Sequence, residues 1–408
     1  MNLIIIVLSL VSFYYILKKD FISQTSHILP KKQTYKNLTY AILIPARDES
    51  KVIEELLISI KQQTKKVNPQ DVYIIVESKT DKTVSIAKKH KMNIFYRQEL
   101  EKQRKGYALD EAIKEILKQK KTYDAYFIFD ADNVLDSKYF EEMEKSIHAG
   151  YDVGIGYRNC KNGNDSIYAA VSSLTFSMIN TLGNEHNLKH NKTITVSGTG
   201  FYISGKIIEK LKGYPFYSLT EDYEFTIYAA LNDYTTTYNK KAIFYDEQPT
   251  TLKETITQRT RWVRGYFDTR KKYYSKLKAK ARKKDENFVS IYSILIGVKP
   301  YIGLLVAAIL FIIKELKVTL IGQSNVSSLL AILSLFLLIY LILLVITAIM
   351  LRKETNTLNL NKQRRYQTLF YNPIFLLTYI ICVIQAFTKK EVSWVKIEHK
   401  EKLKIERN

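Results

Sequence analysis

Residues 327–351 form an apolar run without a single charged side chain. The run is longer than the roughly 20 residues that a helix needs to cross the hydrocarbon core of a bilayer. It therefore predicts a transmembrane helix, and the rest of the chain has to be compatible with insertion into a membrane.

The N-terminal segment, residues 3–17, is also apolar but short, so a cleaved signal peptide is a competing interpretation. No Lys or Arg precedes the segment, and Lys18 and Lys19 follow it in place of small residues. We therefore expect residues 1–20 to form an uncleaved membrane helix. Positive charge belongs on the cytoplasmic side, which places the N-terminus outside the cell.

Two further apolar segments lie near the C-terminus. Residues 291–313 hold one charge, Lys299, and residues 369–387 hold none but contain Pro373. A proline can kink or break a membrane helix. Together with the run at 327–351, these segments predict a C-terminal membrane region over residues 291–388.

The basic tail of the chain creates a conflict of topology. If all C-terminal segments crossed the membrane, residues 389–408 would lie outside the cell, yet they are rich in Lys and Arg. The loop at 314–326, which should be external, carries little positive charge. Because Lys and Arg accumulate inside, we predict that residues 369–387 form a re-entrant or interfacial element and that the tail, with Trp394, is cytoplasmic.

The segment between the membrane regions, residues 40–250, has the pattern of a soluble α/β domain. Short apolar runs alternate with amphipathic ones, which predicts a mostly parallel sheet with helices on both faces. The runs expected to be strands are residues 41–45, 72–76, 93–96 and 125–129. In such sheets ligands bind at the carboxyl ends of the strands.

Charge and cysteine content limit the environment of this domain. With 62 Lys and Arg against 40 Asp and Glu, the formal charge is +22. This excess requires an anionic partner, and membrane lipids are the default because the sequence contains no recognisable nucleic-acid-binding module. Cys160 and Cys382 cannot build a disulfide framework, so we expect the domain to be cytoplasmic and the protein to be a multi-pass cell-membrane protein.

Acidic residues follow the predicted strands although the chain is basic. Asp130 and Asp132 come directly after the fourth strand, and Glu77 follows the second. Two carboxylates this close repel each other unless a cation or proton lies between them, and a hard divalent ion suits oxygen ligands. The competing interpretation is that the Asp-x-Asp pair only caps a turn.

Further motifs follow in a fixed order. A glycine-rich stretch at 196–201 precedes Thr220-Glu221-Asp222, and Gln258-x-x-Arg261-Trp262 comes within a later helical run. This order resembles the membrane-bound family-2 glycosyltransferases, the group of the cellulose, chitin, hyaluronan and poly-N-acetylglucosamine synthases. The resemblance implies a GT-A fold and a nucleotide-sugar donor, with uracil as the base.

The resemblance also assigns the donor site. It implies that Pro45, Ala46 and Glu49 hold the nucleotide base together with Glu77, which stands where the family usually has Asp. Compared with Asp, Glu keeps the carboxylate as hydrogen-bond acceptor but places it one methylene farther from the backbone. Lys105, followed by Gly106, resembles the Lys-Gly pair near the donor phosphates.

The remaining roles concern the diphosphate and the acceptor. The resemblance implies that Asp130 and Asp132 hold Mg²⁺ or Mn²⁺ on the diphosphate and that Asp222 is the general base. Residues assigned to donor phosphates or to the acceptor sugar are Gln258, Arg261, Trp262, Glu221 and Gly200. Positions i, i+3 and i+4 share one helix face, so Gln258, Arg261 and Trp262 should act together. Alternatively, Trp262 is a membrane-interface anchor and Glu221 a helix cap.

Residues 251–290 should form an amphipathic helix at the membrane surface. Aromatic and aliphatic residues alternate there with cations that include Arg259 and Arg270, and a basic cluster follows at 276–284. Such a helix can lie in the headgroup layer, with its cations on anionic lipid.

Three functions remain open at this stage. The first is an inverting enzyme that adds glucose or N-acetylglucosamine units to a growing polysaccharide. The second is a membrane enzyme that transfers one sugar to a lipid or short acceptor. The third is a non-catalytic membrane scaffold, which the complete set of reactive residues disfavours.

Overall fold

A mixed eight-stranded sheet forms the centre of the domain in the computed structural model, which describes residues 1–21, 37–320, 325–389 and 392. The strand order is β3-β2-β1-β4-β7-β6-β8-β5. The strands are β1 (Tyr40–Pro45), β2 (Val72–Val76), β3 (Asn93–Tyr96), β4 (Ala125–Ile128), β5 (Val134–Leu135), β6 (Val153–Cys160), β7 (Phe201–Ser204) and β8 (Thr236–Asp246).

The first four strands are parallel neighbours, as predicted from their apolar runs. Beyond β4 the sheet becomes mixed, because β7 runs antiparallel to both β4 and β6, while β8 is parallel to β6. The GT-A type of fold is therefore confirmed, and the carboxyl ends of β1, β2 and β4 lie at one edge.

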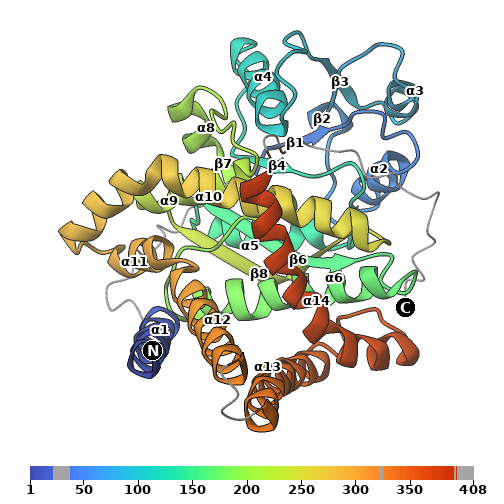
Figure 1. Cartoon of the computed structure of the whole chain (residues 1–408). Coiled ribbons are helices and arrows are strands. Elements are labelled where there is room, and N and C mark those ends of the chain that lie inside the picture. The colour runs from blue at the N-terminus through green and yellow to red at the C-terminus, as the bar shows by residue number, and fades with distance from the viewer. Residues whose placement is uncertain (22–36, 321–324, 390–391, 393–408) are drawn as a thin grey trace.

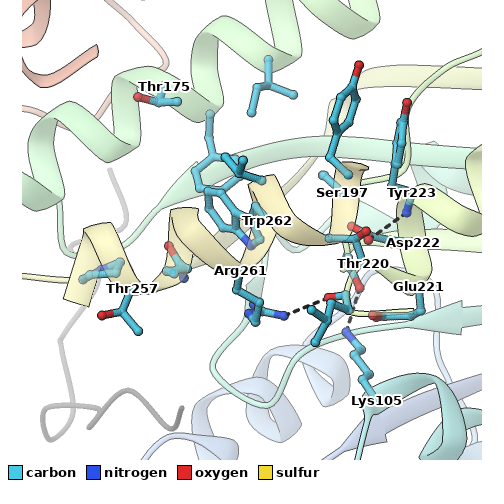
Figure 2. Close-up of a pocket in the computed structure, with 18 of the residues that line it drawn as sticks. Lys105, Thr175, Ser197, Thr220, Glu221, Asp222, Tyr223, Thr257, Arg261 and Trp262 are labelled. Atoms are coloured by element: carbon cyan, nitrogen blue, oxygen red, sulfur yellow. Dashed lines mark hydrogen bonds between the residues drawn. The ribbon is translucent and has the colours of Figure 1, made fainter. Parts of the chain in front are cut away.

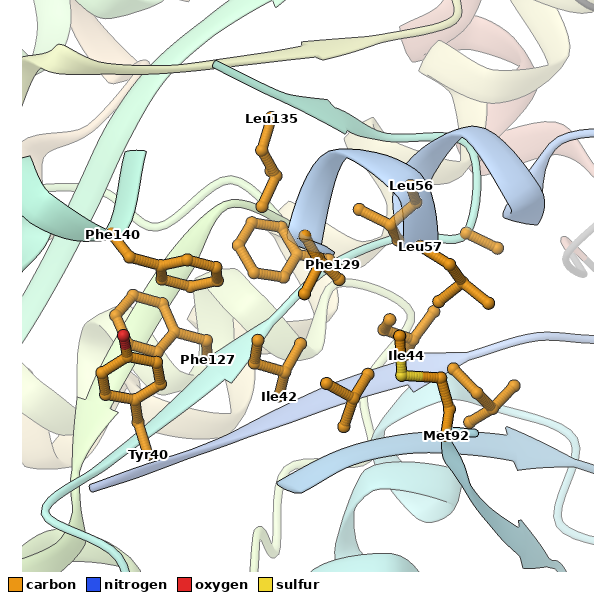
Figure 3. Close-up of a cluster of buried hydrophobic side chains, with 14 of the residues drawn as sticks. Tyr40, Ile42, Ile44, Leu56, Leu57, Met92, Phe127, Phe129, Leu135 and Phe140 are labelled. Carbon is orange, nitrogen blue, oxygen red and sulfur yellow. The ribbon is translucent and has the colours of Figure 1, made fainter. Parts of the chain in front are cut away.

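Helices cover both faces of the sheet. One face packs against α2 (Ile53–Lys61), α3 (Lys82–Lys89) and α5 (Tyr139–His148), with Phe127, Phe129 and Phe140 in the core of that layer (Figure 3). The opposite face packs against α4 (Lys105–Lys118), α8 (Gly205–Leu211) and α9 (Glu221–Leu231). Because each strand contributes alternate side chains to the two layers, the strands are buried throughout.

Shorter helices complete the described part of the chain. One of them, η1 (Pro69–Asp71), lies between α2 and β2. The others follow β6 and are α6 (Ile167–Met178), the π-helix η2 (Ile179–Glu185) and α7 (His186–Lys189).

Four segments of the described chain are long and apolar enough to cross a membrane: Asn2–Lys19, Phe288–Val318, Val326–Lys353 and Lys362–Thr388. They comprise α1 (Asn2–Phe21), α11 (Phe288–Ile296) with α12 (Lys299–Leu320), α13 (Asn325–Lys353) and α14 (Lys362–Thr388). Figure 1 shows α1, α12 and α13 gathered on one side of the domain.

The predicted segment at 291–313 is not one helix. The chain turns at Gly297, which has a φ of +54°, between α11 and α12. Arg270 donates to the carbonyl oxygen of Leu295 at 2.7 Å and also contacts that of Ile294. These carbonyls lie at the end of α11, where helix hydrogen bonding stops.

The amphipathic helix predicted within 251–290 is α10 (Leu252–Lys283), which begins at a capping box of Thr251 and Glu254. The expectation that Arg259 and Arg270 face lipid headgroups is wrong. Arg259 is only 1% exposed, and its guanidinium lies 3.8 Å from the ring centroid of Phe375 in α14. Arg270 is buried against α11. Helices α11 and α14 thus cover a face that the sequence pattern assigned to lipid.

Helix α14 continues through Pro373 without a break, so a re-entrant turn at this position is wrong. A proline removes one helical hydrogen bond, but packing on both sides holds the helix. Tyr371 contacts Tyr168 of α6, and Asn372 donates to Thr347 of α13.

The C-terminal half of α14 packs along α10. Arg264 donates to the carbonyl oxygen of Ala386 at 2.9 Å, and the ring centroids of Phe267 and Phe387 are 5.0 Å apart. This packing favours the interfacial alternative, which stays a prediction. Trp394 and most of the tail lie outside the described residues.

Candidate active site

A cavity of about 1840 Å³ begins at the carboxyl ends of the strands and continues to α10, α12 and α14. Almost all the predicted site residues line it. They are Pro45, Ala46, Glu49, Glu77, Lys105, Asp130, Asp132, Glu221, Asp222, Gln258, Arg261 and Trp262. Motifs that are more than 200 residues apart in the chain, from β1 to α10, therefore face one space.

Gly200 is the exception among the predicted site residues. It does not line the cavity, and a Cβ atom at this position would overlap the ring of Phe244. With a φ of +66°, Gly200, which directly precedes β7, leaves room for the Phe244 ring of β8, and the expected contact with the acceptor has no geometric support. Gly198, two residues earlier, lines the cavity instead.

The end of β2 carries a fixed carboxylate. Glu77 accepts a hydrogen bond from the buried Arg97 at 3.0 Å and pairs with Arg47 at 3.2 Å. Arg97 is anchored in turn by the carbonyl oxygens of Glu99 and Lys102. A carboxylate has about four lone-pair sites, so Glu77 can still accept an N–H from a bound base.

Lys105 lies at the start of α4 and points to the acidic end of β4. Its ammonium donates to Asp130 at 2.5 Å and to the carbonyl oxygen of Gly198 at 2.8 Å. Gly106 lets α4 approach the backbone at Phe216 closely, because a Cβ at this position would overlap the Phe216 carbonyl and touch Glu221. The lysine therefore contacts the Asp-x-Asp turn and also lies near Glu221 and Asp222, beside which Figure 2 shows it.

The Asp-x-Asp turn is pinned by the glycine-rich stretch. The Asp130 amide donates to Thr199 at 2.8 Å and to Asn133 at 3.2 Å, and Thr199 also contacts Asn133. Asp132 accepts the Glu247 amide at 3.0 Å. These bonds fix the two carboxylates toward the cavity.

A divalent cation fits this turn. Over the described residues, no three His, Cys, Asp or Glu side chains converge on one metal position. Magnesium commonly binds through one or two carboxylates and completes its shell with water and substrate phosphates. Asp130 and Asp132 supply that pair, so the donor set suits a metal held jointly with a diphosphate.

Glu221 and Asp222 open α9 and line the same cavity. Burial raises the pKa of the Glu221 carboxyl, and repulsion from Asp222 adds to this. Burial also raises the pKa of Asp222, while the Tyr223 amide and Lys105 oppose the rise. Asp222 accepts the Tyr223 amide at 2.8 Å and keeps its other oxygen available. A carboxylate with a raised pKa is a better proton acceptor.

Helix α10 is pressed onto the Thr-Glu-Asp motif. Gly265 permits the contact, since a Cβ there would lie 2.6 Å from Thr220. Arg261 donates to the carbonyl oxygen of Leu219 at 3.3 Å, and Trp262 packs edge-on against Phe176 of α6 with ring centroids 5.8 Å apart (Figure 2). The indole is therefore part of the cavity wall and not a lipid-facing anchor.

One ion pair of the site was not predicted. Arg158 at the end of β6 donates to Asp246 at the end of β8 at 2.7 Å and to the carbonyl oxygen of Ser197 at 2.9 Å, and both side chains line the cavity. The Arg158 guanidinium also lies 3.8 Å from the Phe176 centroid. The signal available was a charged residue at a strand end, but β6 and β8 were not recognised as strands.

Comparison with known proteins identifies this arrangement. The model of the family described as glycosyltransferase like family 2 matches residues 37–265, which include every motif of the cavity wall. The chain belongs to glycosyltransferase family 2. The probable glycosyltransferase YdaM of Bacillus subtilis (strain 168) is 26% identical over 215 residues, 51% of this chain and 49% of that protein. The chain thus spans about half the length of this curated relative.

Two solved structures of glycosyltransferases are similar to this chain. The mannosyltransferase PcManGT from Pyrobaculum calidifontis, in complex with GDP-Man and Mn²⁺, has 17% identity and a TM-score of 0.56 over 95% of this chain and 99% of that one. S. aureus TarS 1-349 in complex with UDP-GlcNAc has 16% identity and a TM-score of 0.39 over 67% and 81%. The first likeness supports the fold over 95% of this chain.

Proposed function

We propose that this family-2 glycosyltransferase moves a sugar from a nucleoside diphosphate to an acceptor at the cytoplasmic membrane face, with inversion at the anomeric carbon. The observation that carries the proposal is the cavity itself. Lys105, the Asp130-Asp132 turn and Asp222 all line it, and Lys105 donates to Asp130. A diphosphate held at Lys105 and the turn would present its sugar to Asp222.

The donor is held by residues of β1, β2 and α4. Pro45, Ala46 and Glu49 border the base, and Glu77 accepts an N–H from it. The diphosphate lies against Asp130, Asp132 and the cations Lys105 and Arg261. A Mg²⁺ or Mn²⁺ ion on Asp130 and Asp132 would neutralise the charge that develops on the leaving diphosphate. Gln258 borders the same phosphates from α10.

Transfer needs one displacement. The acceptor hydroxyl oxygen forms a bond to the anomeric carbon, the bond from that carbon to the diphosphate oxygen breaks, and the nucleoside diphosphate leaves with the electron pair. Asp222 takes the proton of the hydroxyl. Glu221 and Trp262 border the acceptor, with the indole as a flat surface beside it. A single attack from the opposite face inverts the anomeric configuration.

The sugar and the acceptor define two candidate functions. Glucose or N-acetylglucosamine from a UDP donor, added to a growing polysaccharide, follows from the resemblance to the polysaccharide synthases. Transfer of one sugar to a membrane lipid is the alternative. The apolar lining of the membrane side of the cavity favours this second function.

A donor panel tests the proposal. Purified protein in detergent is incubated with UDP-glucose, UDP-N-acetylglucosamine and GDP-mannose, each with Mg²⁺, with Mn²⁺ or with EDTA, and released nucleoside diphosphate is measured. We expect release with one UDP-sugar, dependent on the metal and lost in Asp222→Asn. Lys114→Met, on the outer side of α4, serves as the control variant. If no donor is turned over under any condition, the proposed activity is wrong.

A further inference from the structure

The membrane side of the cavity is a groove between two apolar helices. Ile302, Leu305 and Ile309 of α12 form one wall, and Leu376, Ile380 and Ile384 of α14 form the other. On these two helices, Tyr301 and Tyr379 are the lining residues with polar side-chain atoms. The groove is therefore lined mainly by hydrocarbon.

The groove exists because α12 and α14 are held apart. Each packs against α13, and α14 also packs against α10 and α6, but the described residues of α12 and α14 do not pack extensively on one another. Both belong to segments that are apolar enough to cross a membrane, so the groove adjoins the lipid phase.

The groove is continuous with the reaction centre. The same cavity contains Asp222, Trp262 and Tyr266, with Val263 and Phe267 leading from the motif helix toward α14. A molecule in the groove therefore has a direct path to the base without leaving the protein surface.

The chemistry of the lining selects its occupant. A glycan carries hydroxyls along its length, and each would lose hydrogen bonds to water without finding partners on isoleucine and leucine side chains. A hydrocarbon chain has no hydrogen bonds to water to lose, and its binding removes apolar surface from water at both walls. The lining thus rejects a growing polysaccharide and accepts a lipid tail.

We infer that the acceptor is a hydroxyl-bearing membrane lipid whose hydrocarbon lies between α12 and α14 and whose hydroxyl reaches Asp222. This inference rests on the proposed function and names its substrate class. The lipid hydroxyl oxygen bonds to the anomeric carbon, its proton passes to Asp222, and the nucleoside diphosphate leaves with the electron pair of the broken bond. The product is a glycolipid with one added sugar.

Adjacent residues offer matched variants. Leu305 and Ile380 line the groove, whereas their neighbours Val306 and Ile381 do not, although all four are similarly exposed. Leu305→Phe with Ile380→Phe should fill the groove from both walls. Val306→Phe with Ile381→Phe adds the same bulk outside the groove and is the control.

Occupancy is tested without catalysis. In a Trp394→Phe background, Trp262 is the remaining tryptophan of the chain. Reconstituted in vesicles of dibrominated phosphatidylcholine with dibrominated dioleoylglycerol, the control should show strong quenching of Trp262 fluorescence, and the groove variant should lose about half of it or more, because bromine quenches at short range and Phe fills the space. Equal quenching in both variants would overturn the inference.

Product analysis gives the second test. Vesicles containing dioleoylglycerol or soluble β-linked glucose and N-acetylglucosamine oligosaccharides receive radiolabelled donor, and label is separated into chloroform-soluble and aqueous products. We expect chloroform-soluble label, reduced about tenfold or more in the groove variant, since each 1.4 kcal/mol of lost lipid binding is a factor of ten. Nucleotide release to water should persist in that variant.

The outcomes separate the two proposals. Aqueous polymer formed equally by the groove and control variants would overturn the lipid inference while leaving the glycosyltransferase activity intact. Absence of nucleotide release in every variant would overturn the proposed function, and the quenching result would still report on the groove. If the double variant does not fold, the single variant Ile380→Phe replaces it in both tests, with Ile381→Phe as its control.

Discussion

The two ends of the cavity are built by different means. At the donor end, charged side chains at strand termini are held by ion pairs and backbone amides, as for Glu77, Asp130 and Asp132. At the membrane end, the walls are aliphatic and come from helices α12 and α14. The donor end is therefore fixed by the sheet before any ligand binds, while the membrane end depends on how helices pack. Substitutions at the donor end should therefore reduce sugar transfer to every acceptor. Substitutions at the membrane end should reduce transfer only to those acceptors that bind there.

The largest effect is expected at the junction of the two ends. Asp222→Asn keeps the shape and the hydrogen bond from the Tyr223 amide but cannot accept a proton. Turnover should fall by about 100- to 10,000-fold, the usual contribution of a general base. Donor binding, measured by titration calorimetry, should be unchanged. A joint collapse of affinity and rate would make Asp222 a binding or structural residue.

A slightly smaller effect is expected at the donor end itself. Asp132→Ala removes a half-buried carboxylate of the cavity wall and not a packing group, so the fold should persist. Turnover should fall about 100- to 1,000-fold, as expected for loss of a group that supports leaving-group charge. Circular dichroism checks the fold. Metal-dependent turnover above about a hundredth of the wild-type rate would contradict the assignment.

The contrast between the two ends also explains what the sequence could predict. Strands β1 to β4 were predicted because each is a short apolar run followed by polar residues. Their carboxylates were found for the same reason, since strand ends and motifs are local features. The groove was not predicted, because its walls come from residues 302–309 and 376–384, and nothing local distinguishes Ile380, which lines it, from Ile381, which does not.

Individual errors have equally physical causes. Arg158 was missed because β6 contains two glycines and was not recognised as a strand. Gly200 was assigned to the acceptor from its neighbourhood, but its positive φ and the ring of Phe244 explain the glycine without a ligand. Arg259 was assigned to the basic face of a surface helix, but in the structure α14 covers it. In each case a tertiary contact decided the role, and such contacts are not visible in a local pattern.

A pH profile sharpens the comparison with a smaller effect. Because burial raises the pKa of Asp222, the base should become protonated, and the rate should fall, at a higher pH than the value of about 3.9 for an ordinary Asp would give. Lys105 lowers this pKa, so Lys105→Met should move the acid limb of kcat to still higher pH at saturating donor. Lys114→Met on the same helix should not move it. An unshifted limb in Lys105→Met would argue against Asp222 as the titrating base.

Gly200 separates packing from chemistry with a smaller effect still. Gly200→Ala introduces an overlap with Phe244 and should lower stability by about 1 to 3 kcal/mol, the usual cost of overpacking. The rate per folded molecule should stay near wild type. Gly183→Ala is the control, because a Cβ there meets no atom within 4 Å. Thermal denaturation measures the stability of each variant, and initial rates measure its activity. A rate defect in a stable Gly200→Ala protein would restore Gly200 to the acceptor site.

The last prediction concerns the side on which α14 ends, where substitution should leave activity unchanged. Arg264 and Phe267 of α10 contact the end of α14 at Ala386 and Phe387. Because α10 also carries Arg261 and Trp262 on the cavity wall, a cytoplasmic reaction centre requires this end of α14 to lie near the cytoplasmic face. The basic residues that follow α14 agree with that side.

Cysteine labelling tests this placement in a background with Cys160→Ala and Cys382→Ala, whose thiols are both buried. We expect Lys389→Cys to resist an impermeant maleimide added to intact cells and to react after permeabilisation. Lys362→Cys should behave in the same way, and Lys317→Cys, in the last turn of α12, should react from outside. Labelling of Lys389→Cys in intact cells would show that α14 spans the bilayer. The groove would then cross the full membrane. A polysaccharide that is moved across the membrane would in that case fit the cavity as well as a lipid acceptor does.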